Sequence, residues 1–147
     1  MTADELERYL HREIPLSAAI GVRVEALGPG GVVLGAPLEP NVNHRRTAFA
    51  GSISALGMLA AWATVQLRLR ADGYDAEAVI QRCALEYHAP AQGALRATCE
   101  TPGADEWARL CAAVGRRGRG RVEATVRIEA AGTLVATLTG QVAAIRG

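Results

Sequence analysis

Polar and apolar residues alternate along most of the chain, and this spacing predicts a series of strands joined by turns. The first helical spacing runs from the N-cap candidate Thr2 to Ile14-Pro15, where proline disfavours continuation. Two alternating runs, Ile20–Leu27 and Val32–Leu38, then flank the turn Gly28–Gly31. Such a pair of runs around a glycine-rich turn predicts a β-hairpin.

The second half of the chain predicts four more strands and a short helix. The alternating runs are Ala78–His88, Leu95–Glu100, Val122–Glu129 and Leu134–Ile145. In the first run, the alternation puts Val79, Gln81, Cys83, Leu85 and Tyr87 on one face. After Pro102, helical spacing of Trp107, Leu110 and Val114 predicts a short helix, and a basic, glycine-rich loop is expected over Gly115–Arg121.

One stretch differs from all others, because it carries no charge from Thr47 to Leu67. A polar loop precedes it, and Asp72-Gly73 ends it, so we expect a helix that begins near Gly51 and ends near Ala71. The stretch is long enough to cross a bilayer. Its many alanines, its glycines and its hydroxyl residues instead favour a helix buried in a protein core.

The order of elements predicts the fold class. Turns join most neighbouring strands, which indicates an antiparallel sheet, and a long uncharged helix is best buried if that sheet curls around it. We therefore predict an α+β fold with one wrapped helix. No linker or internal repeat divides the chain, so residues 1–147 are expected to form a single domain.

Composition excludes several functional classes. The formal net charge is +1, with half of the residues apolar, so disorder is excluded and neither a nucleic-acid nor a membrane partner is expected. The three cysteines and three histidines form no close metal-ligand spacing, so no metal is predicted. The charged N-terminus has no signal-peptide pattern, and a reduced cytoplasm is the expected location.

Four segments carry a family resemblance. They are Tyr9–Leu16, Ala36–His44, Thr47–Ser52 and Leu85–Pro90. Together they are similar to the thioesterase domains of the YiiD C-terminal type, and the similarity runs from Leu6 to about Ile145. This resemblance implies the hotdog fold, in which an antiparallel sheet wraps a central helix. It also implies a homodimer, sometimes a dimer of dimers, that binds acyl thioesters between subunits.

The implied chemistry concentrates where the loop meets the long helix. Free N–H groups near Gly51 and Ser52 would stabilise an oxyanion, because a helix N-terminus is electropositive. Asn43 and His44 would hold or activate a water. Plainer interpretations remain open: Gly51 permits close packing, Ser52 caps the helix, and Asn43 bonds the local backbone of a turn.

The sequence departs from the better-known hotdog thioesterases at two positions. Aligning Asn43 with their conserved asparagine puts Phe49 where they have a histidine and Met58 where they have an acid. No acidic residue lies between Ile53 and Trp62. Glu86 is a weak replacement candidate, because the alternation places it opposite Leu85 and Tyr87. Hydrolysis therefore needs another residue or is slow.

Further residues are candidates for binding substrate. Thr47 would contribute a hydroxyl, and Phe49, Met58 and Trp62 would shape an acyl pocket or simply fill the core. Arg116, Arg117 and Arg119 would hold the phosphates of coenzyme A, since guanidinium pairs well with phosphate. A solvated loop is an equal alternative, and scarce aromatic residues argue against nucleic acid.

The resemblance and the residues together predict hydrolysis of acyl-CoA or acyl-carrier-protein thioesters. The missing helix acid leaves an alternative, a protein that binds acyl thioesters without turning them over. The sequence does not favour a dehydratase over a hydrolase, because a dehydratase also needs a histidine and an acid. No metal or redox cofactor is implied, and coenzyme A enters only as part of the substrate.

Overall fold

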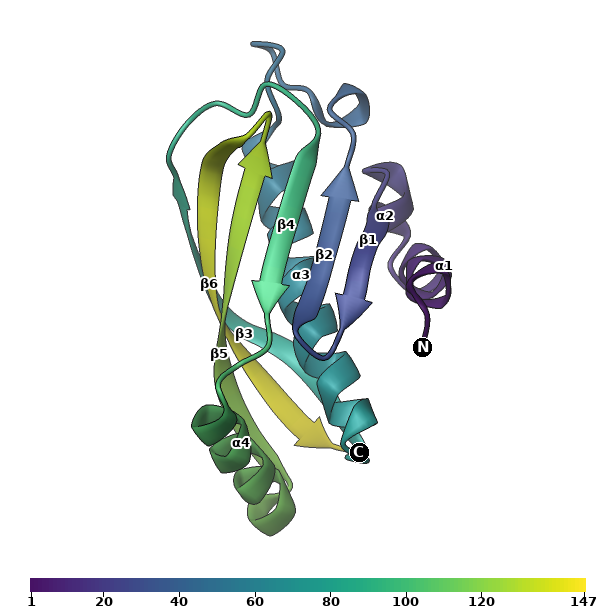
Figure 1. Ribbon diagram of the computed structural model, residues 1–147, viewed down its shortest axis with the longest axis vertical. Coiled ribbons are helices and arrows are strands. Elements are labelled where there is room, and N and C mark those ends of the chain that lie inside the picture. Colours follow the sequence, from purple (N-terminus) through teal and green to yellow (C-terminus); the bar gives the residue numbers. More distant parts are fainter.

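The computed structural model describes all 147 residues. In chain order the elements are α1 (Ala3–Glu13), α2 (Pro15–Ala19), β1 (Arg23–Gly28), β2 (Gly31–Ala36), a 3-10 turn η1 (Glu39–Asn41), α3 (Ala50–Ala71), β3 (Ala76–Tyr87), β4 (Leu95–Glu100), α4 (Ala104–Arg117), β5 (Arg119–Ala130) and β6 (Thr133–Arg146). Figure 1 shows the strands curving around α3.

All neighbouring strands are antiparallel, in the order β1-β2-β4-β5-β6-β3. β1 and β3 are therefore the two edges of the sheet. β3 and β5 have 12 residues each and β6 has 14, at least twice the six residues of β1, β2 and β4, and α4 packs on β5 and β6. This sheet around one long helix confirms the α+β class and the hotdog fold.

α3 is buried because it has no polar side that would require solvent. Eleven of its 22 residues are buried, including Leu56, Leu59, Val65 and Leu69. The buried amide of Gln66 donates to Ala76 O and accepts from Ala78 N–H, so it pairs with the backbone of β3. α3 is the one helix that is long and apolar enough to span a membrane. Within its most apolar segment of 18 residues, 56% is buried inside the fold.

α1 lies against the outer side of this core. The hydroxyl of Thr2 accepts from Glu5 N–H, and the carboxylate of Glu5 accepts from Thr2 N–H, which forms a capping box. Tyr9 stacks on Trp62 of α3 with ring centroids 6.2 Å apart. The predicted helix from Thr2 to Ile14 is confirmed, and the short α2 after Pro15 was not predicted.

Two local predictions were wrong. The register of β3 shifts between Ile80 and Arg82, so Gln81 is an extra residue, and Val79, 46% exposed, does not share a face with Cys83 as predicted. The basic loop over 115–121 is also absent. α4 continues to Arg117, Gly118 ends it at a φ of 72°, and β5 begins at the next residue.

Close packing of α3 on the sheet predicts the effect of adding a side chain at Gly57. A Cβ there would lie 2.9 Å from Leu138 Cδ1 and 3.0 Å from Ile128 Cδ1. Gly57→Val should therefore lower the free energy of unfolding by about 1–3 kcal/mol, the usual cost of overpacking. Chemical denaturation of the two proteins measures this difference in the free energy of unfolding.

Gly115→Ala is the matched control, because its new methyl group would meet open space in α4. It should raise the free energy of unfolding by about 0.5–1 kcal/mol through helix propensity. A Gly57→Val protein as stable as the wild type would contradict this packing of α3.

Candidate active site

The N-terminus of α3 is fixed in place by two backbone hydrogen bonds from the residues before it. Ala48 N–H donates to Ala91 O over 2.9 Å, and Phe49 N–H donates to Asn41 O over 2.7 Å. The helix start is thus held between the turn η1 and the segment after β3. The helix begins at Ala50, one residue earlier than the Gly51 expected from the sequence.

Asn41 is a buried anchor that the sequence analysis missed. Its side-chain amide donates to Ile20 O over 2.9 Å and to Pro37 O over 2.7 Å, and the residue is 2% exposed. These bonds tie the loop before α3 to the segments before β1 and after β2. The position of Asn41 next to Pro40 indicates a turn, but it does not indicate that the side chain is buried, because an asparagine in a loop usually reaches solvent.

Two backbone N–H groups at the start of α3 have no acceptor in the protein. The N-cap residue is Phe49, whose side chain accepts no hydrogen bond, so it leaves the Ala50 and Gly51 N–H groups free. Ser52 N–H instead donates to Phe49 O over 3.0 Å. Of the predicted oxyanion donors, Gly51 is therefore available, while Ser52 N–H is already bonded and Ala50 takes its place.

A hollow of about 390 Å³ lies beside this helix end. Its lining residues come from the loop before α3, the first turn of α3 and the segment that ends β3: Asn43, Thr47, Ala48, Ala50, Ile53, Tyr87, His88, Ala89, Pro90 and Ala91. The Tyr87 hydroxyl donates to Ala50 O over 3.2 Å. The hollow is thus partly apolar, with hydroxyl and amide groups near the free N–H groups.

The side chain of Asn43 is fully engaged in a turn. Its Oδ1 accepts from Arg45 N–H (2.8 Å) and Thr47 N–H (3.2 Å), and its Nδ2 donates to the Thr47 hydroxyl (3.0 Å). Arg46 completes the turn at a φ of 64°. Turn chemistry is therefore the role that the structure shows for Asn43 and Thr47.

The water-holding role predicted for His44 has no support from a single protomer. His44 is exposed, makes no hydrogen bond and does not line the hollow. Arg45 and Arg46 follow it on the same exposed loop, and neither has a carboxylate partner, since the ion pairs of this protein are Arg12–Glu13, Arg96–Glu25 and Arg127–Glu129. The exposed loop between Asn43 and Thr47, two residues that line the hollow, is therefore cationic, a feature not predicted from the sequence.

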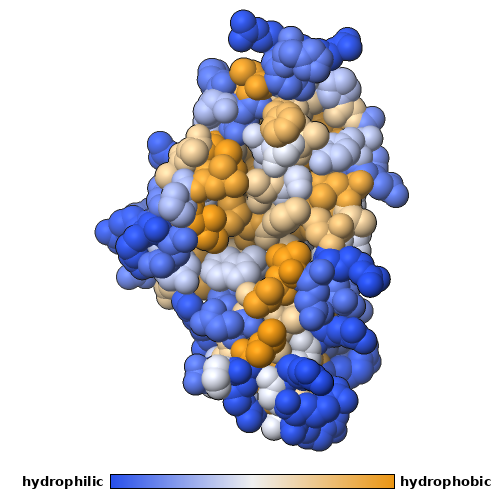
Figure 2. All heavy atoms as spheres, turned by 180° about the vertical axis from the view of Figure 1, so that it is seen from behind, coloured by the Kyte–Doolittle hydropathy of each residue, from blue (hydrophilic) through white to orange (hydrophobic).

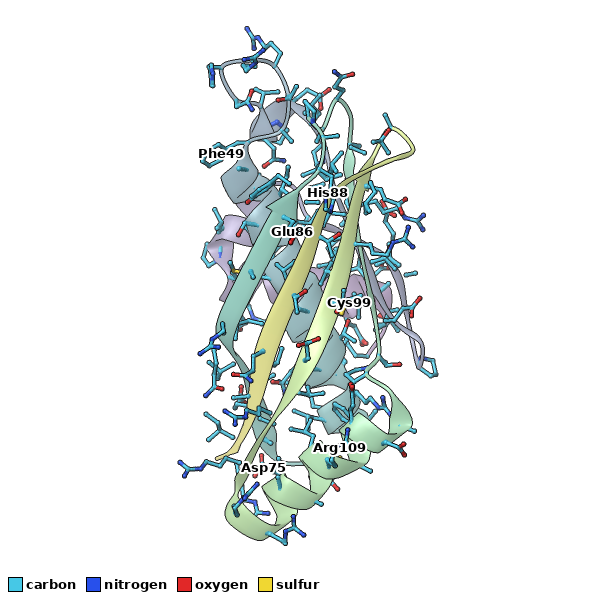
Figure 3. All side chains as sticks on the ribbon, turned by 90° about the vertical axis from the view of Figure 1, so that its left-hand side faces the viewer. Phe49, Asp75, Glu86, His88, Cys99 and Arg109 are labelled. Carbon is cyan, nitrogen blue, oxygen red and sulfur yellow. The ribbon has the colours of Figure 1, made fainter.

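Phe49 lies over the helix end. A Cβ added at Gly51 would collide with the Phe49 ring, so the absence of a side chain at Gly51 makes room for that ring. The ring is 56% exposed, and Figure 3 shows Phe49 projecting from the end of α3. Phe49 is thus placed where an acyl group near the free N–H groups would contact it.

No carboxylate lines the hollow. Glu86 and His88 alternate with Tyr87, so their side chains lie on the outer face of the sheet, and His88 Nε2 is 3.0 Å from the Thr137 hydroxyl. The Glu86 side chain is exposed, and its carboxylate makes no hydrogen bond. The proposed replacement acid therefore does not reach the hollow from its own protomer.

The remaining predicted residues lie away from this end of α3. Met58 and Trp62 pack beside the core, and the Trp62 indole N–H donates to Ala78 O over 2.9 Å. Arg116, Arg117 and Arg119 lie where α4 meets β5, at the opposite end of the molecule (Figure 1). One protomer therefore does not bring the arginine cluster to the N-terminus of α3.

The cysteines lie outside the hollow. Burial raises the pKa of the Cys83 and Cys99 thiols, which lowers the fraction of reactive thiolate at neutral pH. No group of three or more His, Cys, Asp or Glu side chains is arranged to hold a metal ion. The groups that line the hollow are thus backbone N–H, hydroxyl and amide groups, apolar side chains and His88, with no carboxylate or thiol among them.

The wrapped helix with exposed N–H groups beside a hollow defines a protein of the hotdog class. Residues 3–146 match the family described as "Putative thioesterase (yiiD_Cterm)", and the chain belongs to that family. The resemblance noted from the sequence is thereby confirmed over nearly the whole chain.

Solved structures agree with this assignment. A protein of unknown function from Chlorobaculum tepidum TLS is 26% identical, with a TM-score of 0.93 over 99% of this chain and 94% of that one. A protein from Shewanella oneidensis described as a putative thioesterase is also 26% identical (TM-score 0.86; 97% and 96% covered). A probable thioesterase from Pseudomonas aeruginosa is 25% identical (TM-score 0.81; 99% and 97%).

The turn built on Asn43 predicts a loss of stability when this side chain is removed. Asn43→Ala should lower the free energy of unfolding by about 1–2 kcal/mol, because hydrogen bonds to Arg45 N–H and Thr47 N–H are lost. His44→Ala is the neighbouring control and should stay within about 0.5 kcal/mol. Equal effects of the two substitutions, measured by chemical denaturation, would contradict the turn role.

Proposed function

We propose that this protein binds acyl thioesters with the carbonyl oxygen at the N-terminus of α3, where Ala50 and Gly51 N–H donate to it, and hydrolyses them. The observation that carries the proposal is the pair of free N–H groups beside a hollow, in a family of thioesterases. The end of a helix behaves as a charge of about +0.5, so it favours the negative oxygen that forms when a nucleophile attacks.

The cationic loop beside the hollow suits the rest of the substrate. Arg45 and Arg46 lie on the loop next to the hollow without carboxylate partners, and they would pair with the phosphates of coenzyme A or with the acidic surface of a carrier protein. Phe49 would contact the acyl group. The predicted phosphate-binding role of Arg116, Arg117 and Arg119 remains a proposal that would require a second copy of the chain.

Hydrolysis also needs a water molecule delivered to the carbonyl carbon. Without a carboxylate in the hollow, the protein would accelerate hydrolysis mainly by orienting the thioester and stabilising the oxyanion. Tyr87 and Thr47 line the hollow, and their hydroxyl oxygens, already bonded to Ala50 O and to the Asn43 turn, would offer lone pairs to such a water. The same lack of a carboxylate favours the second candidate function, binding of acyl thioesters without turnover.

We further propose that two copies associate to complete the site. β3 is a 12-residue edge strand with no partner on its free side, and edge strands of this length favour pairing with another chain. Seen from behind, where β1, β2 and β4 do not cover α3, apolar side chains gather along the middle of the molecule (Figure 2). A homodimer would cover both features.

The free N–H of Ala50 can be removed without changing the helix. Ala50 is the first residue of α3, where proline is well tolerated, and Phe49 already has the extended backbone (ψ 133°) that precedes proline. Ala50→Pro should lower kcat for acyl-CoA hydrolysis by about a hundredfold to a thousandfold, the usual effect of losing an oxyanion donor. Thiol release and the masses of the acyl products measure turnover across short and long acyl chains.

Two control variants separate this loss from other effects. Ala104→Pro makes the same change at the first residue of α4, and it should leave turnover unchanged. Ala50→Val adds bulk but keeps the N–H group. If Ala50→Pro turns over and binds acyl-CoA like the wild type, the donor role is wrong. Measurable binding without turnover in the wild type, weakened by Ala50→Pro, would favour the non-catalytic candidate.

The proposed dimer predicts the mass in solution. Sedimentation equilibrium should give twice the chain mass of 15.4 kDa, or a multiple of it for a dimer of dimers. Val79→Lys places a charge on the exposed side of β3 and should shift the equilibrium toward the monomer. A wild-type protein that remains monomeric at high concentration would contradict the association.

A further inference from the structure

A second and larger cavity, of about 750 Å³, lies at the other end of α3. Its walls come from the β1–β2 hairpin, the last two turns of α3, Thr101 after β4, and Met1. It shares no residue with the hollow beside Ala50. Thr64, its first contact on α3, is 13 residues beyond Gly51, a separation of about 20 Å along the helix.

The inner part of this cavity is mainly apolar. Val32 and Thr64 are each 2% exposed and lie deepest, while Leu27 and Leu67 are half-buried on facing elements. The Thr64 hydroxyl donates to Ala60 O over 2.8 Å, so it needs no further acceptor. The volume is in the range of pockets that bury small organic molecules. This part of the cavity therefore suits a hydrocarbon chain.

The rim of the cavity carries two arginines without carboxylate partners. Arg68 is held in place, because it donates to Pro102 O over 2.8 Å and its guanidinium lies 4.4 Å from the centroid of the Trp107 ring. Arg70 is exposed, with its guanidinium 5.6 Å from the Tyr9 ring. Neither forms an ion pair. Arg68 is thus ordered before any ligand arrives, and its charge is not neutralised.

One carboxylate, that of Asp72, also lines the cavity, so two positive side chains stand against one negative. Asp72 Oδ2 accepts from the Trp107 indole N–H over 2.7 Å and forms no ion pair with either arginine. The carbonyls of Arg68 and Arg70 accept from Asp72 N–H and Gly73 N–H. Arginines at a helix C-terminus also offset the helix dipole, so their charge alone does not indicate a site. What indicates a site is the combination of an apolar cavity with two guanidinium groups that form no ion pair.

We propose that this cavity binds a single-chain amphiphile with an anionic head group, a carboxylate or a phosphate. The hydrocarbon chain would lie on Leu27, Val32 and Leu67, and the head group would pair with Arg70, while Arg68 adds a second positive charge to the lining. A free fatty acid and a lysophospholipid share this chemistry. The site is separate from the N-terminus of α3, so it does not depend on the proposed thioester function.

Titration of the ¹⁵N-labelled protein with dodecanoate, below its micelle concentration, tests the proposal. Amide shifts should change at residues 27–32, 64–72 and 101 and saturate with one binding site. Dodecyltrimethylammonium, with the same chain and a cationic head, should bind at least about tenfold more weakly, the effect of losing one charge-assisted hydrogen bond. Dodecyl phosphate run in parallel distinguishes a phosphate head group from a carboxylate one.

Three variants sharpen the result. Leu67→Trp should fill the cavity and abolish the shifts, while Arg70→Gln should weaken dodecanoate binding about tenfold. Arg109→Gln, on the exposed side of α4, is the charge-matched control and should bind like the wild type.

Several outcomes would overturn the proposal. They are equal affinity for the cationic amphiphile, shifts centred elsewhere, or binding that Leu67→Trp leaves unchanged in a protein with wild-type thermal stability. Cavity shifts that follow protein concentration rather than dodecanoate would instead identify a contact between copies. Thioester turnover is a separate measurement, so failure here leaves the function at the N-terminus of α3 intact.

Discussion

The structure depends on packing a helix of 22 residues, uncharged as far as Leu67, into a curved sheet. Because α3 has no polar face, one side of it is buried by the strands, and its remaining apolar residues stay partly exposed. The few buried polar groups are matched individually, as Gln66 is by the backbone of β3. Packing of this helix accounts for the curvature of the sheet around it.

The same constraint leaves polar backbone groups at the helix start. A polar N-cap residue would normally satisfy them, but α3 begins after Phe49, so the Ala50 and Gly51 N–H groups stay free. Asn41, Ala91 and Tyr87 bond to the backbone around them and hold the helix end in position. Two consecutive N–H donors therefore lie exposed at the start of α3, where Ala50 lines the hollow, and they are the groups that we propose stabilise an oxyanion.

The fold was predictable because the strand alternation and the uncharged helical run each extend over many residues without interruption. Alternation in the runs after Val122 and Leu134, and the uncharged run to Leu67, gave the hairpin and the central helix. The bulge at Gln81 carries no local signal, so the inner face of β3 was assigned wrongly at Val79. The stretch 115–121 looked like a loop because of its glycines, although only Gly118 takes a conformation that ends a helix.

The site was only partly predictable, for a related reason. Sequence pattern identified the loop and the start of α3, but the bond from Tyr87 to Ala50 joins residues 37 positions apart. For Asn43 the sequence left two roles open, bonding the backbone of a turn or holding a water. Only the folded turn shows that both its amide oxygen and its amide nitrogen are already hydrogen-bonded. The cavity at the far end of α3 is built from separate segments, none of which carries a motif.

The most direct test is to observe the Ala50 and Gly51 amides while a thioester analogue binds. A non-hydrolysable acyl-CoA analogue, with a methylene group in place of the sulfur, keeps the carbonyl oxygen that these groups would contact. The account predicts large, saturable changes in the ¹H and ¹⁵N shifts of Ala50 and Gly51, and slower amide exchange at both. Binding of the analogue that leaves these two amides unchanged would contradict it.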